Sequence, residues 1–498
     1  MGLTVALVNT TPVQNVIARR AAYWLSQKLN TKVLVAHVRI DFLNHMALQG
    51  LYIEDKAHDT LLYAGEARVR ITDWFVFSKK PVFHYVSLTN SYAHLYRKKN
   101  SAEWNYDFIA KAFETNDKKP HTADTSVFEF ALEQVALNNV RFHFDDEWGG
   151  EDMDFDIGKL DLNANTLDFR KKLIDIEKIA MKNVVVSMKE YEAGKPRTHP
   201  QGYIPPIDTT PFNPDLWTVL IKKLSLEGSE YYLTASDRVP VPGLFDEDHL
   251  VIKEIKTDIK DISIIGDTIR GQSLGLYARE RCGIVIKTLR SKVTISPVAS
   301  ICEELYLETN NCKLHDYYAM RYKHFPNFLD YIDSVVMEGH LDKSIVDTRD
   351  IAYFAPELKA LPAILTVTGS GKGTVANLKC HGITVADGRS VIRGDLSMKG
   401  LPDIYKTYIT YNNGEIFTTG ESILKYAPSL RGSPTIALEA ITHAYYKGSY
   451  TGYIDNFLVN GILTTNLGSL ATTNVRLSMP YFKSNLSTYS GIIATDKA

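Results

Sequence analysis

The apolar residues at the start of the chain recur with a helical period. In TPVQNVIARRAAYWLSQKL (11–29) they stand three or four positions apart and form one stripe, and Asn30 is the expected end of the helix. This pattern predicts an N-terminal amphipathic helix within residues 1–31. Two interpretations stay open: the helix packs on the end of a sheet, or it rests at a membrane surface, as Trp24 and the basic residues favour. The stripe consists of Val13, Val16, Ile17, Ala21, Trp24, Leu25 and Leu29.

From Lys32 onward the period falls to two. Apolar residues alternate with polar ones, as in DTLLYAGEARVRI (59–71), and short strands follow one another at intervals of about eight residues, with Asn44-His45 as one expected turn. Each strand thus has one apolar face and one polar, solvent-exposed face, which indicates an antiparallel sheet that is covered on one face only. The residues expected on the covered face include Val38, Ile40, Val69, Ile71, Leu160 and Leu162.

Breaks in this pattern divide the chain into segments. Residues 192–215 hold six of the 19 prolines and predict an extended linker between a β segment at 32–191 and a second at 216–363. Short helices are expected at 104–113, 326–337, 354–360 and 402–408. In the last segment, 364–498, the sequence from Gly373 is echoed 79 residues later from Gly452, which suggests repeated hairpin units.

Composition narrows the function classes. The 56 basic and 58 acidic residues give a net charge of −2, which argues against nucleic acid as a main partner. The four cysteines form no CxxC pair, and Cys302 and Cys312 are either free thiols or bridged across a hairpin. The sequence has no apolar span of 18 residues, but the apolar MGLTVALV at 1–8 reads as the tail of a membrane helix. We therefore expect the chain to be a piece of a longer protein.

Candidate catalytic and metal motifs fail on spacing. TGSGKGT (368–374) lacks the first glycine and the Ser or Thr of a phosphate-binding loop and predicts a glycine-rich hairpin turn. Asp152, Asp154 and Asp156 lack the glycine and the twelfth-position acid of a calcium loop, so they predict a wet strand face. No nucleophile–base arrangement stands out. The sequence thus predicts a non-enzymatic protein without cofactor or metal.

Three stretches carry a resemblance to a known family. The head of the chain at 9–74, with DTLLYA at Asp59–Ala64, is followed by CKLHDYYAMRYKHFPNFLDYIDSVVMEGHLDKSIVDTRDIAYFAPELK (312–359) and VIRGDLSMKGLPDI (391–404). Together they resemble the AsmA-like and TamB proteins of Gram-negative envelopes, the inner-membrane component of the translocation and assembly module, in its Bacteroidetes form. The likeness touches most of the chain in patches. It implies an N-terminal portion, because TamB proteins are far longer and end in a domain that is missing here.

The resemblance implies a fold and a function. The fold is a mostly β, elongated, curled antiparallel sheet, a taco-like β-groove of the bridge-like lipid transfer type, with an N-terminal amphipathic helix and a few short helices. Its apolar inner face carries phospholipids between the inner and outer membranes. The family is periplasmic, anchored in the inner membrane here through a helix at or upstream of Met1–Val8, with an outer-membrane barrel partner of the BamA/TamA type. The lipid-contact candidates are Val16, Ile17, Trp24, Leu25, Val38, Ile40, Val69, Ile71, Leu160 and Leu162.

Other interpretations remain open. Two sheets packed as a sandwich give the same period of two, so periodicity alone does not separate a sandwich from a groove. An exposed strand edge can template nascent outer-membrane barrels by β-augmentation without carrying lipid. A secreted β-rich carbohydrate-binding or hydrolytic protein is a third alternative, and it requires a cleft with paired carboxylates and stacked aromatic rings.

Overall fold

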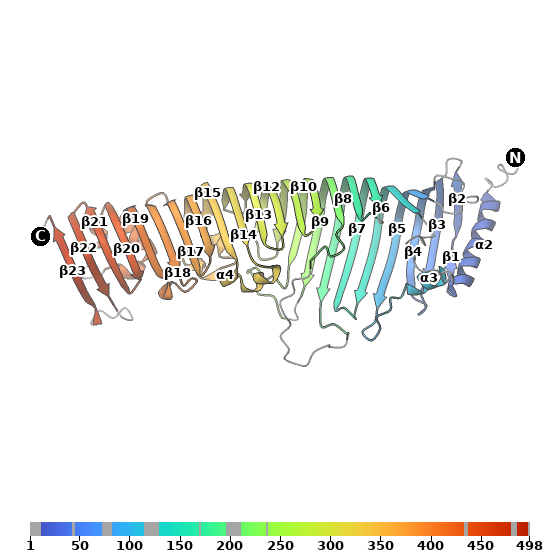
Figure 1. Cartoon of the computed structure of the whole chain (residues 1–498), viewed down its shortest axis with the longest axis horizontal. Coiled ribbons are helices and arrows are strands. Elements are labelled where there is room, and N and C mark those ends of the chain that lie inside the picture. Colours follow the sequence, from blue (N-terminus) through green and yellow to red (C-terminus); the bar gives the residue numbers. More distant parts are fainter. Residues whose placement is uncertain are drawn as a thin grey trace. The chain divides into compact units, whose positions relative to one another are not determined.

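The structure is a computed structural model of the 498-residue chain. It describes residues 11–41, 45–71, 82–113, 129–168, 171–195, 211–235, 238–432, 437–479 and 486–496. The sequence correctly predicts a mostly β chain, because the described residues form 23 strands and few helices (Figure 1). The chain divides into two compact units: unit 1 holds residues 1–205, 213–266 and 273–285, and unit 2 holds 206–212, 267–272 and 286–498.

Unit 1 contains two helices and the first strands. The helices are α2 (Thr11–Leu29) and α3 (Asp107–Phe113). The first strands are β1 (Val33–Leu34), β2 (His37–Asp41), β3 (His45–Glu54), β4 (Thr60–Ile71), β5 (Val82–Arg97) and β6 (Glu129–Asp146). The later ones are β7 (Glu151–Asp168), β8 (Leu173–Glu190), β9 (Thr218–Thr234), β10 (Val251–Ile265) and most of β11 (Thr268–Glu280).

Pairing in unit 1 is mainly antiparallel between neighbours in the sequence. β1 and β2 both pair with β3, and antiparallel pairs continue from β3 to β5, from β6 to β8 and from β9 to β10. Two pairs, β5 with β6 and β8 with β9, are parallel, so the sheet is mostly antiparallel, as expected. A parallel pair needs a long crossover connection, and both have one. The first runs through α3, and the second contains the proline-rich segment 192–215, of which 196–210 lie outside the described residues.

α2 is fastened to the start of this sheet by its C-terminal half (Figure 1). Ser26 Oγ accepts from Val33 N at 2.8 Å, and Lys56 Nζ donates to the carbonyl oxygen of Leu29 at 2.6 Å. Asn30 has a φ of 48°, the left-handed conformation that ends a helix, so the predicted helix end is confirmed. Buried Ala22 and Leu29 form an apolar cluster with Val33.

Unit 2 contains the remaining strands and several short helices. The strands are β12 (Val285–Ser296), β13 (Ala299–Glu308), β14 (Lys313–Arg321), β15 (Val336–Asp347), β16 (Ile364–Thr374), β17 (Asn377–Ala386), β18 (Val391–Lys399), β19 (Tyr408–Thr418), β20 (Ala444–Tyr453), β21 (Asn456–Thr465), β22 (Gly468–Ser478) and β23 (Thr488–Thr495). The helices are η1 (Phe325–Asp330), α4 (Tyr331–Ser334), α5 (Thr348–Ile351), η2 (Pro356–Ala360), η3 (Ile404–Lys406), α6 (Gly420–Tyr426), η4 (Pro428–Leu430) and η5 (Leu438–Ala440). From β12 to β23 each strand pairs antiparallel with the next.

Most long strands are interrupted near the middle at a residue with positive φ, which in unit 2 and between β9 and β10 lies at a break in register typical of a β-bulge, whereas β6 pairs with β7 and β8 with β9 there without a shift. Where the register shifts, the extra residue of a β-bulge is expected to bend its strand. We call these mid-strand positions the bulge row of each unit. In unit 1 it includes Asn90, Asn139, Asn183 and Gly228, and in unit 2 Glu304, Asp316, Lys343, Gly382, Asn413 and Asn474.

Several local predictions need correction. The helix expected at 326–337 is a 3-10 turn, η1, followed by the four-residue α4, and β15 begins at Val336 because that segment pairs with β14. The glycines of 368–374 lie within β16, not in a turn. His45 is the first residue of β3, whereas Asn44 lies outside the described residues. All four cysteines are free, so of the two alternatives for Cys302 and Cys312 the structure has the free thiols.

An uncovered apolar face as the candidate functional site

One face of the unit 1 sheet carries apolar residues in cross-strand rows. Residues directly opposite each other on paired strands point to the same face, so the register defines which side chains lie together. One row follows the register from β3 to β10 without a polar residue: Met46, Val69, Val86, Val135, Leu162, Ile179, Leu224 and Ile259. The row beside it contains Val38, Leu48, Ala67, Leu88, Leu137, Leu160, Met181 and Leu226.

The opposite face is charged. Arg141 and Asp156 are cross-strand partners joined at 3.0 Å, and Lys182 and Glu227 are joined at 2.7 Å. Such pairs repeat across the sheet on exposed side chains, which keeps this face in water. The three carboxylates of Asp152, Asp154 and Asp156 belong to it, as the spacing-two interpretation predicts. No group of residues suited to a metal ion occurs among the described residues.

The apolar face of unit 1 has no second layer over most of its strands. Within the described part of this unit the strands contact their neighbours in one sheet, and no further sheet packs on it (Figure 1). Side chains of α2 and α3 pack against the sheet near β1. At the ends of β5 and β6 Trp104 packs on Phe144, with ring centroids 4.7 Å apart. Most side chains of the two rows are accordingly half-buried and not enclosed. The sandwich alternative finds no partner sheet here.

The structure brings most of the predicted strand residues together. Val38, Leu160 and Leu162 lie in these rows, Val38 with only 8% of its surface exposed. Val69 lies between Met46 and Val86. By backbone register Ile40 pairs with Met46 and Ile71 with Phe83, whereas the side chains of Ile40 and Ile71 are outside the described set.

The predicted helix residues are not on one packed stripe. Leu25 joins the buried cluster of Ala22 and Leu29, but Val16 and Trp24 are 52% and 56% exposed. The side chain of Ile17 lies outside the described set. The packed side of α2 shares Leu25 and Leu29 with the predicted stripe and continues through Ala22, whereas Val16 and Trp24 of the stripe lie outside it.

The face also has an aromatic part, which was not predicted from the sequence. Phe142 and Phe155 are cross-strand partners with ring centroids 5.9 Å apart, on the same side as Leu137 and Leu160. The numbering parity changes between Leu137 and Phe142 because Asn139 has a left-handed φ of 53° and, like Gly158 opposite it, is skipped in the pairing. The Asn-Asn pair at 138–139, at the point where apolar residues change parity, is the signal that would have located it.

Unit 2 has an apolar face of its own. Its longest cross-strand row contains Met320, Met337, Gly373, Leu378, Met398, Ile409, Gly452, Phe457, Leu477 and Tyr489. α4 covers part of it, since the Tyr331 hydroxyl lies 3.8 Å from Met320 Sδ and 3.4 Å from the Tyr318 hydroxyl. The Leu378 and Phe457 positions are the two copies of the sequence echo, and both directly follow the first residue of a strand after a two-residue turn.

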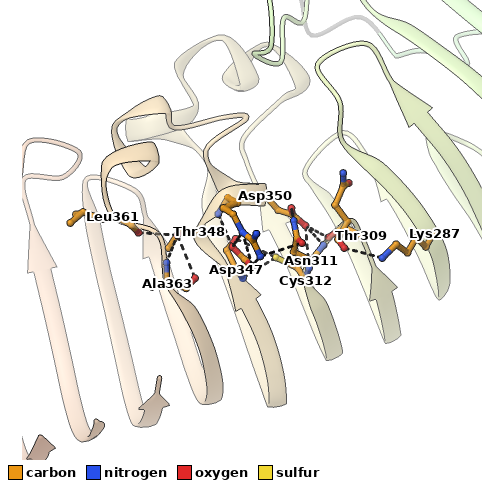
Figure 2. Close-up of polar contacts among 11 residues, drawn as sticks. Lys287, Thr309, Asn311, Cys312, Asp347, Thr348, Asp350, Leu361 and Ala363 are labelled. Atoms are coloured by element: carbon orange, nitrogen blue, oxygen red, sulfur yellow. Dashed lines mark hydrogen bonds and ion pairs between the residues drawn. The ribbon is translucent and has the colours of Figure 1, made fainter. Parts of the chain in front are cut away.

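A cluster of polar side chains in unit 2 contains a thiol and carboxylates, residue types that also occur in catalytic sites (Figure 2). The buried carboxylate of Asp350 accepts hydrogen bonds from Thr309 Oγ1 at 2.5 Å, Asn311 N at 2.8 Å and Cys312 N at 3.1 Å. Burial raises the pKa of the Cys312 thiol, which opposes the thiolate that a nucleophile needs. Asp347 is bound by Arg349. The cluster therefore joins the β13–β14 turn to α5 and has a structural role.

A pocket of about 340 Å³ lies at the end of β5. We compared it with the cleft of paired carboxylates and stacked aromatic rings that a carbohydrate-binding or hydrolytic protein requires. The lining of the pocket includes Asp55, Glu103 and Trp104, and Trp104 stacks on Tyr106 at 5.8 Å. The Asp55 carboxylate is buried and accepts from Ala57 N and Asp59 N, while Arg97 lies over the Trp104 ring. Neither a reactive carboxylate pair nor an open stacking platform is available there.

No protein-family model, curated protein or solved structure matches the chain.

Proposed function

We propose that this chain is the N-terminal portion of an AsmA-like/TamB envelope protein that carries phospholipids along the apolar face of its sheet. The observation that supports this most is the polar-free row from Met46 to Ile259 in unit 1 on a sheet with a single layer. A packed domain would cover such a face, because apolar surface gains about 25 cal/mol per Å² when it leaves water. An acyl chain gains about 0.8 kcal/mol for each methylene buried on it.

The bulge row supports a curled sheet. A β-bulge bends its strand and increases its twist, and in unit 1 Gly228 lies at such a break in register between β9 and β10. Mid-strand breaks aligned on adjacent strands favour a bend of the sheet along one line. Gly158 and Asn183 show the fit on neighbouring strands: a Cβ at Gly158 would lie 3.0 Å from Asn183 Cβ. In this proposal the bend forms a groove whose inner side is the apolar face, and α2 is the amphipathic helix at its membrane end.

The sequence resemblance supports the rest of the proposal. It assigns the protein to the periplasm and its anchor to a helix at or upstream of Met1–Val8, which lie outside the described residues. Among the described helices none combines the length and hydropathy required to span a bilayer. A barrel of the BamA/TamA type is the proposed outer-membrane partner.

The test is phospholipid content of the purified chain by native mass spectrometry. Leu137 and Leu160 face each other on β6 and β7, and the adjacent pair Asn138 and Lys159 points to the charged face. We expect co-purified phospholipid in the wild type and a fall of at least fivefold in a Leu137→Gln, Leu160→Gln variant. The matched Asn138→Gln, Lys159→Gln variant should keep the wild-type amount.

Two results would overturn lipid carriage. One is a wild-type chain that is free of lipid and stays so after incubation with phospholipid vesicles. The other is equal lipid content in both double variants when circular dichroism shows both to be folded. Lipid-free protein that crosslinks to a nascent barrel strand would instead support the scaffold alternative.

A further inference from the structure

The outward side of α2, which faces away from the packed cluster of Ala22 and Leu29, has exposed basic, aromatic and apolar side chains. The helix contains Arg19, Arg20 and Lys28 and no Asp or Glu. These three side chains are exposed, as are Val16, Tyr23 and Trp24, at 52%, 67% and 56%. A soluble helix normally carries charges of both signs and few aromatic residues on its outer side, so this side differs from an ordinary solvent face.

The helix geometry separates this surface from the packed side. Val16, Arg20, Tyr23 and Gln27 follow at four- and three-residue steps, so they lie one above another along the helix. Ala22, Leu25 and Leu29 follow in the same way on the side that contacts β1 and α3. Docking of the outward side therefore leaves the attachment of α2 to unit 1 intact.

Its chemistry complements an anionic bilayer. Three cations on the helix stand against a net charge of −2 for the whole chain. Each Lys or Arg near an anionic leaflet contributes about 1 kcal/mol, and Trp and Tyr prefer the headgroup level. The Lys28 ammonium lies 5.3 Å from the Trp24 ring centroid, so the aromatic and basic groups form one continuous patch. We propose that this outward side of α2 docks on the surface of an anionic phospholipid bilayer, with the helix parallel to the membrane plane.

This inference deepens the proposed function by naming the membrane surface that α2 meets, and it can fail independently of lipid carriage. The experiment is co-sedimentation of the full chain with phosphatidylcholine vesicles and with vesicles containing 30% phosphatidylglycerol. We expect binding to the anionic vesicles that is at least tenfold tighter than to the neutral ones and that weakens in 0.5 M salt. A blue shift of tryptophan emission should accompany it and disappear in Trp24→Phe.

Charge-reversal variants make the test specific. Arg19→Glu with Arg20→Glu should lower the affinity for anionic vesicles at least tenfold. Lys359→Glu with Lys379→Glu, at exposed positions of unit 2, changes the net charge equally and should stay within threefold of the wild type. Equal binding by both double variants, or equal binding to neutral and anionic vesicles, would overturn the proposal. Lipid co-purification should be unchanged in Arg19→Glu, Arg20→Glu, whereas the Leu137→Gln, Leu160→Gln variant should lose lipid but keep vesicle binding.

Discussion

Tyr446 lies across the backbone of Gly461, so that a Cβ on this glycine would be 2.9 Å from Tyr446 Cε2. The Tyr446 hydroxyl passes over the bulge and donates to the carbonyl oxygen of Asn460 at 3.0 Å. The same arrangement recurs two strands earlier, where Tyr411 is 2.9 Å from the Cβ position of Gly394 and donates to Arg393 O at 2.6 Å. At both glycines the space for a Cβ is therefore filled by a tyrosine ring together with backbone atoms of the neighbouring strand.

The first prediction concerns this tyrosine–glycine contact. Gly461→Ala places a Cβ 2.5 Å from Lys447 O and 2.9 Å from Tyr446 Cε2 at a φ of +157°, so we expect it to lower the free energy of unfolding of this region by more than about 2 kcal/mol. Gly382→Ala is the matched control, because Gly382 has a φ of +55° with no atom within 4 Å of its Cβ position. It should cost only about 1 kcal/mol of backbone strain. Hydrogen exchange of β20 and β21 measures the first effect, and equal costs at both sites would contradict it.

The second prediction follows from the Asp350 cluster. Burial alone raises the pKa of this carboxyl, but hydrogen bonds from Thr309 and from Asn311 outweigh burial and hold the pKa below its usual range. Asp350→Asn places an amide N–H among these donors, and we expect it to lower the free energy of unfolding by about 2 kcal/mol at pH 7. The exposed Asp342→Asn on β15 is the control and should change it by less than about 0.5 kcal/mol. Chemical denaturation measures both.

The pH dependence of the unfolding free energy, compared between the wild type and Asp350→Asn, tests whether the charge of the Asp350 carboxylate stabilises the fold. A depressed carboxyl pKa contributes stability above its unfolded value of about 4, and that stability is lost as the pH falls through the lower folded value. Between pH 5 and 2 the wild type should therefore lose more unfolding free energy than Asp350→Asn. Parallel curves for the two proteins would mean that the carboxylate charge does not matter in the fold.

The faces of regular strands can be predicted from the sequence better than the points where the alternation is interrupted. Lys159 to Leu162 alternate without a break, so the assignment of Leu160 and Leu162 to one face holds. Asn139 reverses the alternation of β6, and a strict period of two loses the face at that point. The glycines of 368–374 were predicted to form a turn because local propensity does not show where two strands approach each other closely. At Gly369 a Cβ would lie only 2.8 Å from Ile383 Cα on the neighbouring strand.

The orientation of α2 could not be predicted for a different reason. An amphipathic stripe shows which residues share a side, but the partner decides which side packs. Ser26 fixes the helix to Val33 of β1, and Lys56, which follows β3, holds the carbonyl of Leu29 at the C-terminal end of the helix. With the helix held in this way, Ala22 is buried and Trp24 is exposed. The two hydrogen bonds join residues that lie seven and 27 positions apart in the chain, beyond the reach of a local pattern.

The third prediction concerns the reactivity of Cys282. Burial, followed by the Glu280 carboxylate, raises the pKa of this thiol to about 11. In a variant with the other three cysteines changed to Ser, alkylation by iodoacetamide at pH 8 should be at least tenfold slower in the folded than in the denatured chain. The rate should keep rising up to about pH 11. Equal rates for folded and denatured protein would show that Cys282 is open to water.

The fourth prediction tests whether water reaches the charged face. Arg141 and Asp156 lie 3.0 Å apart with exposed side chains, and an ion pair in water contributes little because solvent screens it. A double-mutant cycle with Arg141→Ala and Asp156→Ala should give a coupling of less than about 1 kcal/mol that shrinks in 0.5 M salt. A coupling above about 2 kcal/mol that ignores salt would mean that the pair is desolvated, and so that another layer covers this side. Lipid carriage requires phospholipid to cover the apolar face and water to cover the charged face. A desolvated Arg141–Asp156 pair would therefore contradict the proposed function.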